Sequence, residues 1–129
     1  MEKEFVPYEP SLVLKELGFD EPCFWCYLEN DISAPADFSR EGRVYPSNSD
    51  LLLDWVSAPL YQQAFRFFRE KYGYDVSIKK CTSTQYKFVI TQSFVENDYY
   101  FIDYPFPSHE NAELECLKKL IEIVKRKIV

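Results

Sequence analysis

The segment 57–73 limits the folds open to this chain more than any other stretch, because it has an aromatic helical face with a signal at each end. Apolar residues recur there at the three- and four-residue spacing of one helix face: Tyr61, Ala64, Phe65, Phe68 and Tyr72. We expect Ser57 to be the N-cap, Pro59 to lie in the first turn and Gly73 to end the helix. Burying its four rings contributes roughly 1.5–3 kcal/mol each, so other elements should pack on this face.

The composition is typical of one globular domain. The chain has 129 residues, of which 47% are hydrophobic and 18% aromatic, and a globule of this size buries about two-thirds of the surface of its unfolded chain. The net charge of −6 argues against broad nucleic-acid affinity, since phosphate binding depends on clustered Lys and Arg, although a local basic patch is compatible with it. We therefore expect a single domain over residues 1–129.

The chain shows no sign of a membrane or secretory destination. Residues 1–7 are charged and lack the apolar core of a secretion signal. No apolar run approaches the ~20 residues needed to cross a bilayer. We therefore expect a cytoplasmic protein without a membrane partner, in a reducing compartment where thiols are usually core residues and disulfides are rare.

The first half of the chain contains one predicted helix and one predicted strand. A short helix over 8–17 is followed by Gly18, and the apolar run 23–28 predicts a strand covered on both faces. Segment 29–56 is the long irregular part, because prolines and glycines break every periodicity in it. It could hold a binding surface, and a short strand over 43–45 could return beside the first.

The second half predicts an antiparallel meander followed by a long helix. The strands are expected over 74–79, 85–94 and 99–104, and the helix over 108–127 with Ser108 as N-cap. The apolar stripe of that helix comprises Ala112, Cys116, Leu117, Leu120, Ile121, Val124 and Ile128. Glu115 with Lys119 and Glu122 with Arg126 are expected to form ion pairs. The fold class is therefore α+β: an antiparallel sheet of three to five strands, with two main helices packed against it and a short N-terminal helix.

The cysteines are the first candidates for chemistry. In an extended strand, Cys23 and Cys26 point to opposite faces, so they are badly placed to share one metal ion, and a redox pair would favour a helix N-terminus. Core thiols are the interpretation we favour. A metal site assembled with Cys81 and Cys116 is an alternative, and redox chemistry is a weaker one.

The remaining polar groups form no catalytic motif. His109, the only histidine, falls in the first turn of the last predicted helix, where a solvated turn residue is more common than a general base. The acidic groups at 20–21, at 96–98 and at Glu110 fall in predicted turns and caps. Three scattered glycines cannot build a phosphate loop. We therefore expect a protein that is not an enzyme, with no catalytic residue, metal or cofactor.

The order of elements from 57 to 127 resembles that of the double-stranded-RNA-binding domain, in which lysines that contact phosphates begin the last helix. Residues 109–113 (HENAE) place carboxylates there instead, so only the order agrees. A double-stranded nucleic-acid-binding module is therefore an alternative function. A salt-dependent shift on duplex RNA would test it.

The segments 57–72 (SAPLYQQAFRFFREKY) and 112–123 (AELECLKKLIEI) resemble small phage- or prophage-encoded proteins of Bacteroides-type bacteria, a family of unknown function. Residues 1–8 and 14–20 resemble it too, whereas 29–56 does not. More distantly, the pattern is similar to phage alpha-beta-alpha sandwich proteins. The resemblance implies a bacterial cytoplasm and expression from mobile DNA, and it supplies no catalytic residues.

We therefore expect a phage-related accessory protein that acts through protein–protein interaction. Its partner would be a host or phage protein, and a homodimer is a further option. A compact fold rich in Tyr and Phe is compatible with that role. The alternatives are the double-stranded nucleic-acid-binding module above and a small zinc-binding protein that uses its cysteines.

Overall fold

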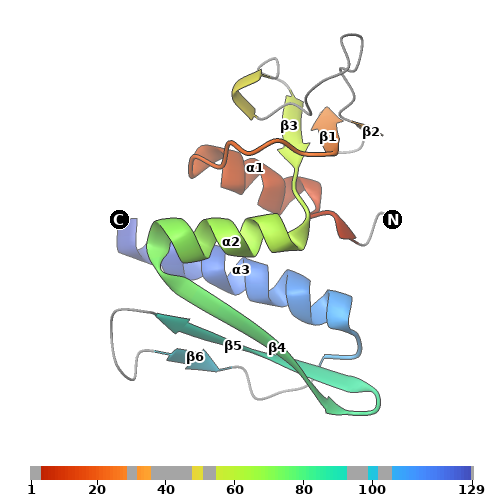
Figure 1. The fold of residues 1–129 in the computed structure, drawn as a ribbon, viewed down its shortest axis with the longest axis vertical. Coiled ribbons are helices and arrows are strands. Elements are labelled where there is room, and N and C mark those ends of the chain that lie inside the picture. The colour runs from red at the N-terminus through yellow and green to blue at the C-terminus, as the bar shows by residue number, and fades with distance from the viewer. Residues whose placement is uncertain are drawn as a thin grey trace. The chain divides into compact units, whose positions relative to one another are not determined.

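The computed structural model describes residues 4–28, 32–35, 48–50, 55–92, 99–101 and 106–128 (Figure 1). The chain divides into two compact units, Met1–Ala64 and Phe65–Val129, and each is considered by itself below. Both contain helices and antiparallel strands, so the α+β class is confirmed. The single domain over 1–129 stays a prediction. Within the described residues, none of the helices combines the length and apolar character that crossing a membrane requires.

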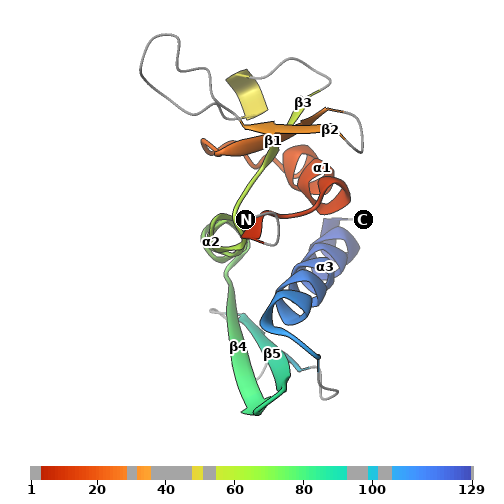
Figure 2. The same ribbon diagram turned by 90° about the vertical axis from the view of Figure 1, so that its right-hand side faces the viewer.

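Unit 1 is a helix on a three-stranded antiparallel sheet. It contains α1 (Tyr8–Glu16), β1 (Trp25–Leu28), β2 (Ile32–Pro35), the short 3-10 helix η3 (Asn48–Asp50) and β3 (Trp55–Ala58). Strand β1 is central and pairs with β2 and β3, so that Cys26 lies opposite both Ala34 and Ser57. Helix α1 lies along one face of this sheet (Figure 2) and contacts β3.

The predicted helix over 8–17 is confirmed as α1, and local chemistry explains its ends. Pro10 lies in the first turn, where its missing N–H costs nothing. Gly18 follows the helix with a φ of 101°, a left-handed conformation that glycine adopts without steric cost. The helix buries Leu14 and Ser11, and the Ser11 hydroxyl donates to the Val6 carbonyl at 3.0 Å. Apolar residues are buried throughout the unit: Phe5, Val6, Leu14, Phe19, Cys23, Cys26, Val56, Ala58, Tyr61 and Ala64.

The predicted aromatic helix is α2 (Tyr61–Tyr72), and its predicted start is wrong. Ser57 is not an N-cap: it is buried in β3, where its pairing with β1 outweighs its capping preference. The prediction that Gly73 ends the helix is confirmed by its φ of 77° and by its N–H, which donates to the Arg69 carbonyl at 3.1 Å.

Unit 2 contains a second three-stranded sheet and one long helix. Strands β4 (Tyr74–Thr82), β5 (Gln85–Gln92) and β6 (Tyr99–Phe101) form the predicted antiparallel meander. The prediction that strands share one sheet is wrong, because the described strands are divided between β2-β1-β3 and β4-β5-β6. The pairing of β1 with β3, which the sequence did not indicate, creates the additional sheet.

Helix α3 (His109–Ile128) follows the prediction closely. The Asn111 N–H donates to Ser108 Oγ at 3.1 Å, which confirms the N-cap. The predicted stripe is buried at Ala112, Cys116, Leu117, Leu120, Ile121 and Val124, and the side chain of Ile128 lies outside the described residues. The helix lies along β4 and β5 (Figure 2).

The surface ion pairs of α3 match the prediction only in part. The pair of Glu122 with Arg126 is confirmed. Glu115 pairs with Lys118 at 3.5 Å instead of Lys119, and Lys119 pairs with Glu122 at 3.6 Å. Each pair joins residues three or four positions apart, as side chains on one side of a helix allow.

The segment 29–56 contains regular structure that its sequence pattern did not indicate. Strand β2, helix η3 and the start of β3 lie in it. The predicted strand over 43–45 lies outside the described residues, as do the ends of the predicted strands beyond Gln92 and Phe101.

Candidate functional site

The loop 19–23 lies between α1 and β1 and is held in place by hydrogen bonds. Four hydrogen bonds reach it, three of them from residues 29 or 41 positions away and one from inside the loop. We call this segment the tethered loop. Distant tethers of this kind fix the loop relative to the sheet of unit 1.

Asn48 supplies the buried tether. It is only 8% exposed; its Nδ2 donates to the Phe19 carbonyl at 2.8 Å and its Oδ1 accepts from the Ser57 N–H at 2.9 Å. One side-chain amide therefore satisfies a carbonyl of the loop and an N–H of β3 together. The next residue adds a second contact, because the Ser49 N–H donates to Asp20 Oδ1 at 2.7 Å.

Gln63 supplies the other distant tether. Its Nε2 donates to the Pro22 carbonyl at 2.8 Å, and its Oε1 accepts from the Leu60 N–H at 2.9 Å. The second bond is half of a capping box at the start of α2, since Gln63 is the third helical residue and reaches back to the N-cap amide. One residue therefore caps the helix and holds the loop.

Phe24 follows the tethered loop directly and is the large apolar residue that the described part of the chain leaves most exposed, at 48%. The next residue, Trp25, is half-buried, and its ring lies 5.8 Å from that of Phe5. Asp20 is exposed and Glu21 half-exposed in the preceding loop. The result is a phenyl ring presented next to a fixed loop that carries two carboxylates.

The structure places three of the four cysteines in the protein interior. Cys23, Cys26 and Cys116 are buried free thiols, as predicted, whereas Cys81 is exposed. Burial raises the pKa of Cys23 to about 12, and the nearby Glu21 carboxylate adds to the effect. Burial also raises the pKa of Cys26 and of Cys116. A protonated, buried thiol is a poor nucleophile and a poor metal ligand.

The described residues do not form the zinc site that the sequence analysis considered as an alternative. Throughout the ranges that the structure describes, which include all four cysteines, no three His, Cys, Asp or Glu side chains gather as a metal site would require. Cys23 precedes β1 and Cys26 lies in its second position, so the two do not occupy one tight turn.

His109 begins α3, as predicted, and its ring is held by two neighbours. Its Nδ1 lies 3.3 Å from Glu113 Oε1, one helical turn on, and the Tyr86 ring meets it edge-on at 5.6 Å between centroids. The side chain is 49% exposed. Glu110 is exposed in the same turn, and residues 96–98 lie outside the described residues. This geometry fits a helix start that is pinned to β5.

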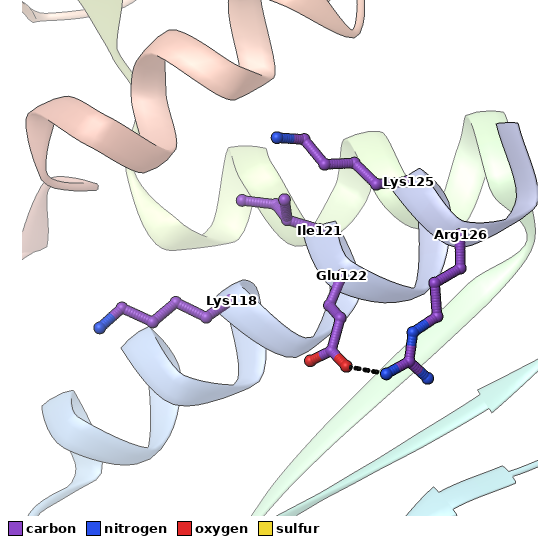
Figure 3. Close-up of a pocket in the computed structure, with 5 residues that line it drawn as sticks. All are labelled: Lys118, Ile121, Glu122, Lys125 and Arg126. Atoms are coloured by element: carbon purple, nitrogen blue, oxygen red, sulfur yellow. Dashed lines mark ion pairs between the residues drawn. The ribbon is translucent and has the colours of Figure 1, made fainter. Parts of the chain in front are cut away.

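A shallow depression runs along the C-terminal half of α3 (Figure 3). Its lining residues are Lys118, Ile121, Glu122, Lys125 and Arg126. Figure 3 shows that these side chains come from successive turns of one helix and that Glu122 and Arg126 form an ion pair. Because the carboxylate is engaged and the other polar groups are Lys and Arg, the depression has no acid–base pair.

Compared with protein-family models, curated proteins and solved structures, the chain matches none. The identification of the tethered loop and Phe24 as a candidate site therefore rests on their geometry. Sequence reasoning recognised residues 20–22 as a turn and missed their role, because the tethers Asn48 and Gln63 are distant in sequence and belong to no motif. The one local signal was an aromatic residue directly after a turn.

Proposed function

We propose that the protein is a non-enzymatic accessory protein, related to those of phages and prophages, that binds a protein partner in the bacterial cytoplasm. The observation that carries the proposal is the exposure of Phe24 beside a loop held by four hydrogen bonds. The three buried thiols and the engaged His109 are compatible with a binding role.

The fixed loop explains how one exposed ring can contribute to binding. Aromatic residues are enriched among the side chains that dominate protein interfaces. Ordering a loop on binding costs free energy, so a loop that is already fixed binds more tightly for the same contacts. In this proposal, Phe24 is the anchor of the interface and the tethered loop is its rigid support.

The charge of unit 1 indicates what kind of partner fits. Residues 1–64 contain 12 Asp and Glu against 4 Lys and Arg. Asp20 and Glu21 precede the anchor by four and three positions in sequence. A partner that offers an apolar socket rimmed by Lys or Arg would complement both features, because opposite charges at an interface rim favour association.

Affinity capture from a lysate of a Bacteroides-type bacterium tests the proposal when variants are compared. Phe24→Ala should lose a protein that the wild type captures, and Phe67→Ala, which truncates a half-buried ring on α2, should keep it. Loss with both variants, or with neither, would contradict the proposal. Deleting the whole segment 29–56 is a poorer test, since it removes β2 and η3.

The oligomeric state decides whether the partner is a second copy of this chain. Sedimentation of the wild type and of Phe24→Ala over a range of concentrations gives it directly. A dimer that Phe24→Ala dissociates would identify the homodimer as the complex.

A further inference from the structure

Strand β4 forms one border of the sheet in unit 2. The sheet has the order β4-β5-β6, so that β5 lies on one side of β4 (Figure 2). Within the described residues, no strand pairs with its other side. The strand is nine residues long, whereas an average strand has about 5–6 residues. Such an edge presents a row of backbone groups with which a further strand can pair.

The ladder shows which residues of β4 turn their backbone polar groups toward this edge. Tyr86 exchanges backbone hydrogen bonds of 2.9 and 2.8 Å with Phe106, so its N–H and C=O point away from β4. Because Lys80 pairs with Tyr86, its own N–H and C=O point away from β5. The direction alternates along a strand, so those of Ile78 and Val76 point outward too. In the part of the chain that the structure describes, nothing hydrogen-bonds to these outward groups.

Two apolar side chains lie at the same edge. Val76 and Ile78 belong to the face of the sheet that α3 covers, which they share with Tyr86, a neighbour of His109 on α3. Both side chains are only half-buried. A strand added at this edge would remove more of their apolar surface from water, which favours association.

The sequence of β4 is complementary to itself in one antiparallel register. In that register, Ser77 lies opposite the partner's Ser77. Asp75 then lies opposite the partner's Lys79, and opposite charges that face each other across a ladder stabilise it. Val76 lies opposite the partner's Ile78, and both residues have outward N–H and C=O groups that can exchange hydrogen bonds.

Other registers lose this match. A slip of one residue places an outward-pointing residue opposite one that points toward β5, so the hydrogen bonds are lost. A slip of two places Asp75 or Lys79 opposite the uncharged Ser77, and a slip of four places like charges opposite each other. Asp75 also interacts within its own chain. A carboxylate has about four acceptor sites, so that interaction and the contact with Lys79 are compatible.

We propose that β4 pairs with β4 of a second copy of this chain, antiparallel and centred on Ser77. The two three-stranded sheets then form one sheet of six strands. Both copies use the same surface, as in a twofold-symmetric dimer. The charges select a second copy over other strands, because a lysine on an edge disfavours a strand that offers no acid opposite it. This interface is separate from Phe24 and does not rest on the proposed partner.

Disulfide crosslinking tests the position and the register together. Ser77 is exposed and meets its copy as a non-hydrogen-bonded pair, whose Cα atoms lie about 4.5 Å apart, within the range of a disulfide. Ser77→Cys, combined with Cys81→Ser to remove the exposed native thiol, should give a covalent dimer with oxidised glutathione.

The matched control for crosslinking is Thr91→Cys with Cys81→Ser. Position 91 is exposed on the same face as Ser77, but it lies on β5, so its two copies are at least about 14 Å apart in the proposed dimer. It should give no covalent dimer. A covalent dimer from both variants, from neither, or from the control alone would overturn the proposal.

Exchanging the charges tests the complementarity. Asp75→Lys and Lys79→Asp each place like charges opposite one another, so sedimentation should show self-association weakened roughly 10-fold. An equimolar mixture of the two variants restores both opposite-charge pairs and should associate about as well as the wild type. Lys118→Asp, which makes the same change of charge on an exposed residue of α3, should change association by less than about twofold.

Phe24→Ala separates this interface from the site in unit 1. It should leave the dimer intact, whether or not it loses the captured partner. A wild type that stays monomeric up to millimolar concentration, a dimer that Phe24→Ala dissociates, or a charge-exchanged mixture that associates no better than its components would overturn the pairing of β4 with a second copy.

Discussion

Gln63 donates a hydrogen bond to the carbonyl oxygen of Pro22, 41 residues earlier in the sequence, at 2.8 Å. The same side chain accepts from the Leu60 N–H and so caps α2. The conformation of the tethered loop beside Phe24 is thereby linked to the first turn of a helix. The two hydrogen bonds use different atoms of one amide, so substitutions can separate them.

Gln63→Glu and Gln63→Ala should differ in stability. Glutamate keeps an oxygen for the Leu60 N–H and adds a favourable negative charge at a helix N-terminus, but it cannot donate to Pro22. Alanine loses both hydrogen bonds, so we expect its free energy of unfolding to fall by about 1–2 kcal/mol, and that of Gln63→Glu by less. Urea denaturation measures both. Equal losses would show that the helix cap contributes nothing.

Asn48→Ala should destabilise unit 1 strongly, because it leaves the Phe19 carbonyl and the Ser57 N–H without this partner in a buried site. Each unsatisfied buried group costs about 1–3 kcal/mol, so a loss of roughly 2–4 kcal/mol is expected. Ser49→Ala is the matched control, since Ser49 is exposed and contacts Asp20 through its backbone. It should change stability by no more than about 0.5 kcal/mol. A loss at Asn48 as small as the control's would rule out the buried tether.

The parts of the fold that follow from local sequence were predicted well. Helix α3 carries its own N-cap at Ser108 and an unbroken apolar stripe, and β4 alternates apolar and polar residues over 74–79. In these elements, the residues that decide the structure lie within a few positions of one another. Local periodicity was therefore sufficient.

The parts that depend on distant contacts were not predicted. Ser57 has the residue type and position of an N-cap, yet it pairs with Cys26, 31 positions earlier, and extends β3 instead. The same pairing divides the strands between two sheets. At the candidate site, Asn48 and Gln63 act on residues 29 and 41 positions away. No periodic pattern in the sequence encodes these contacts.

Thiol labelling should distinguish the cysteines by burial. Cys81 is exposed, whereas Cys23, Cys26 and Cys116 are buried. We expect one thiol per folded molecule to react quickly with a chromogenic disulfide reagent and all four to react in denaturant. Cys81→Ser should abolish the fast phase. A fast phase that survives this substitution would show that a buried thiol is accessible.

The raised pKa of Cys23 predicts a stability contribution that disappears at alkaline pH. The folded state holds the proton up to a pKa of about 12, whereas the reference thiol loses it at 9.0, so the contribution is complete below pH 9.0 and is lost as pH rises toward 12. The stability difference between wild type and Cys23→Ala should therefore shrink above pH 9.0, by at most about 1.4 kcal/mol per pH unit. Urea denaturation at several pH values measures it, with Ser49→Ala as a non-titrating control. A difference that stays constant up to pH 11 would contradict the buried thiol.

The most direct test of the binding role is photo-crosslinking from the position of the anchor itself. A photoreactive phenylalanine analogue is placed at position 24, or at position 67 as the control, and the protein is irradiated in the lysate that yields the captured partner. The account predicts one adduct of defined mass from position 24, which excess unlabelled wild type competes away, and no such adduct from position 67. An adduct from position 67 but not from position 24 would contradict it, because the partner would then bind away from Phe24 and the tethered loop.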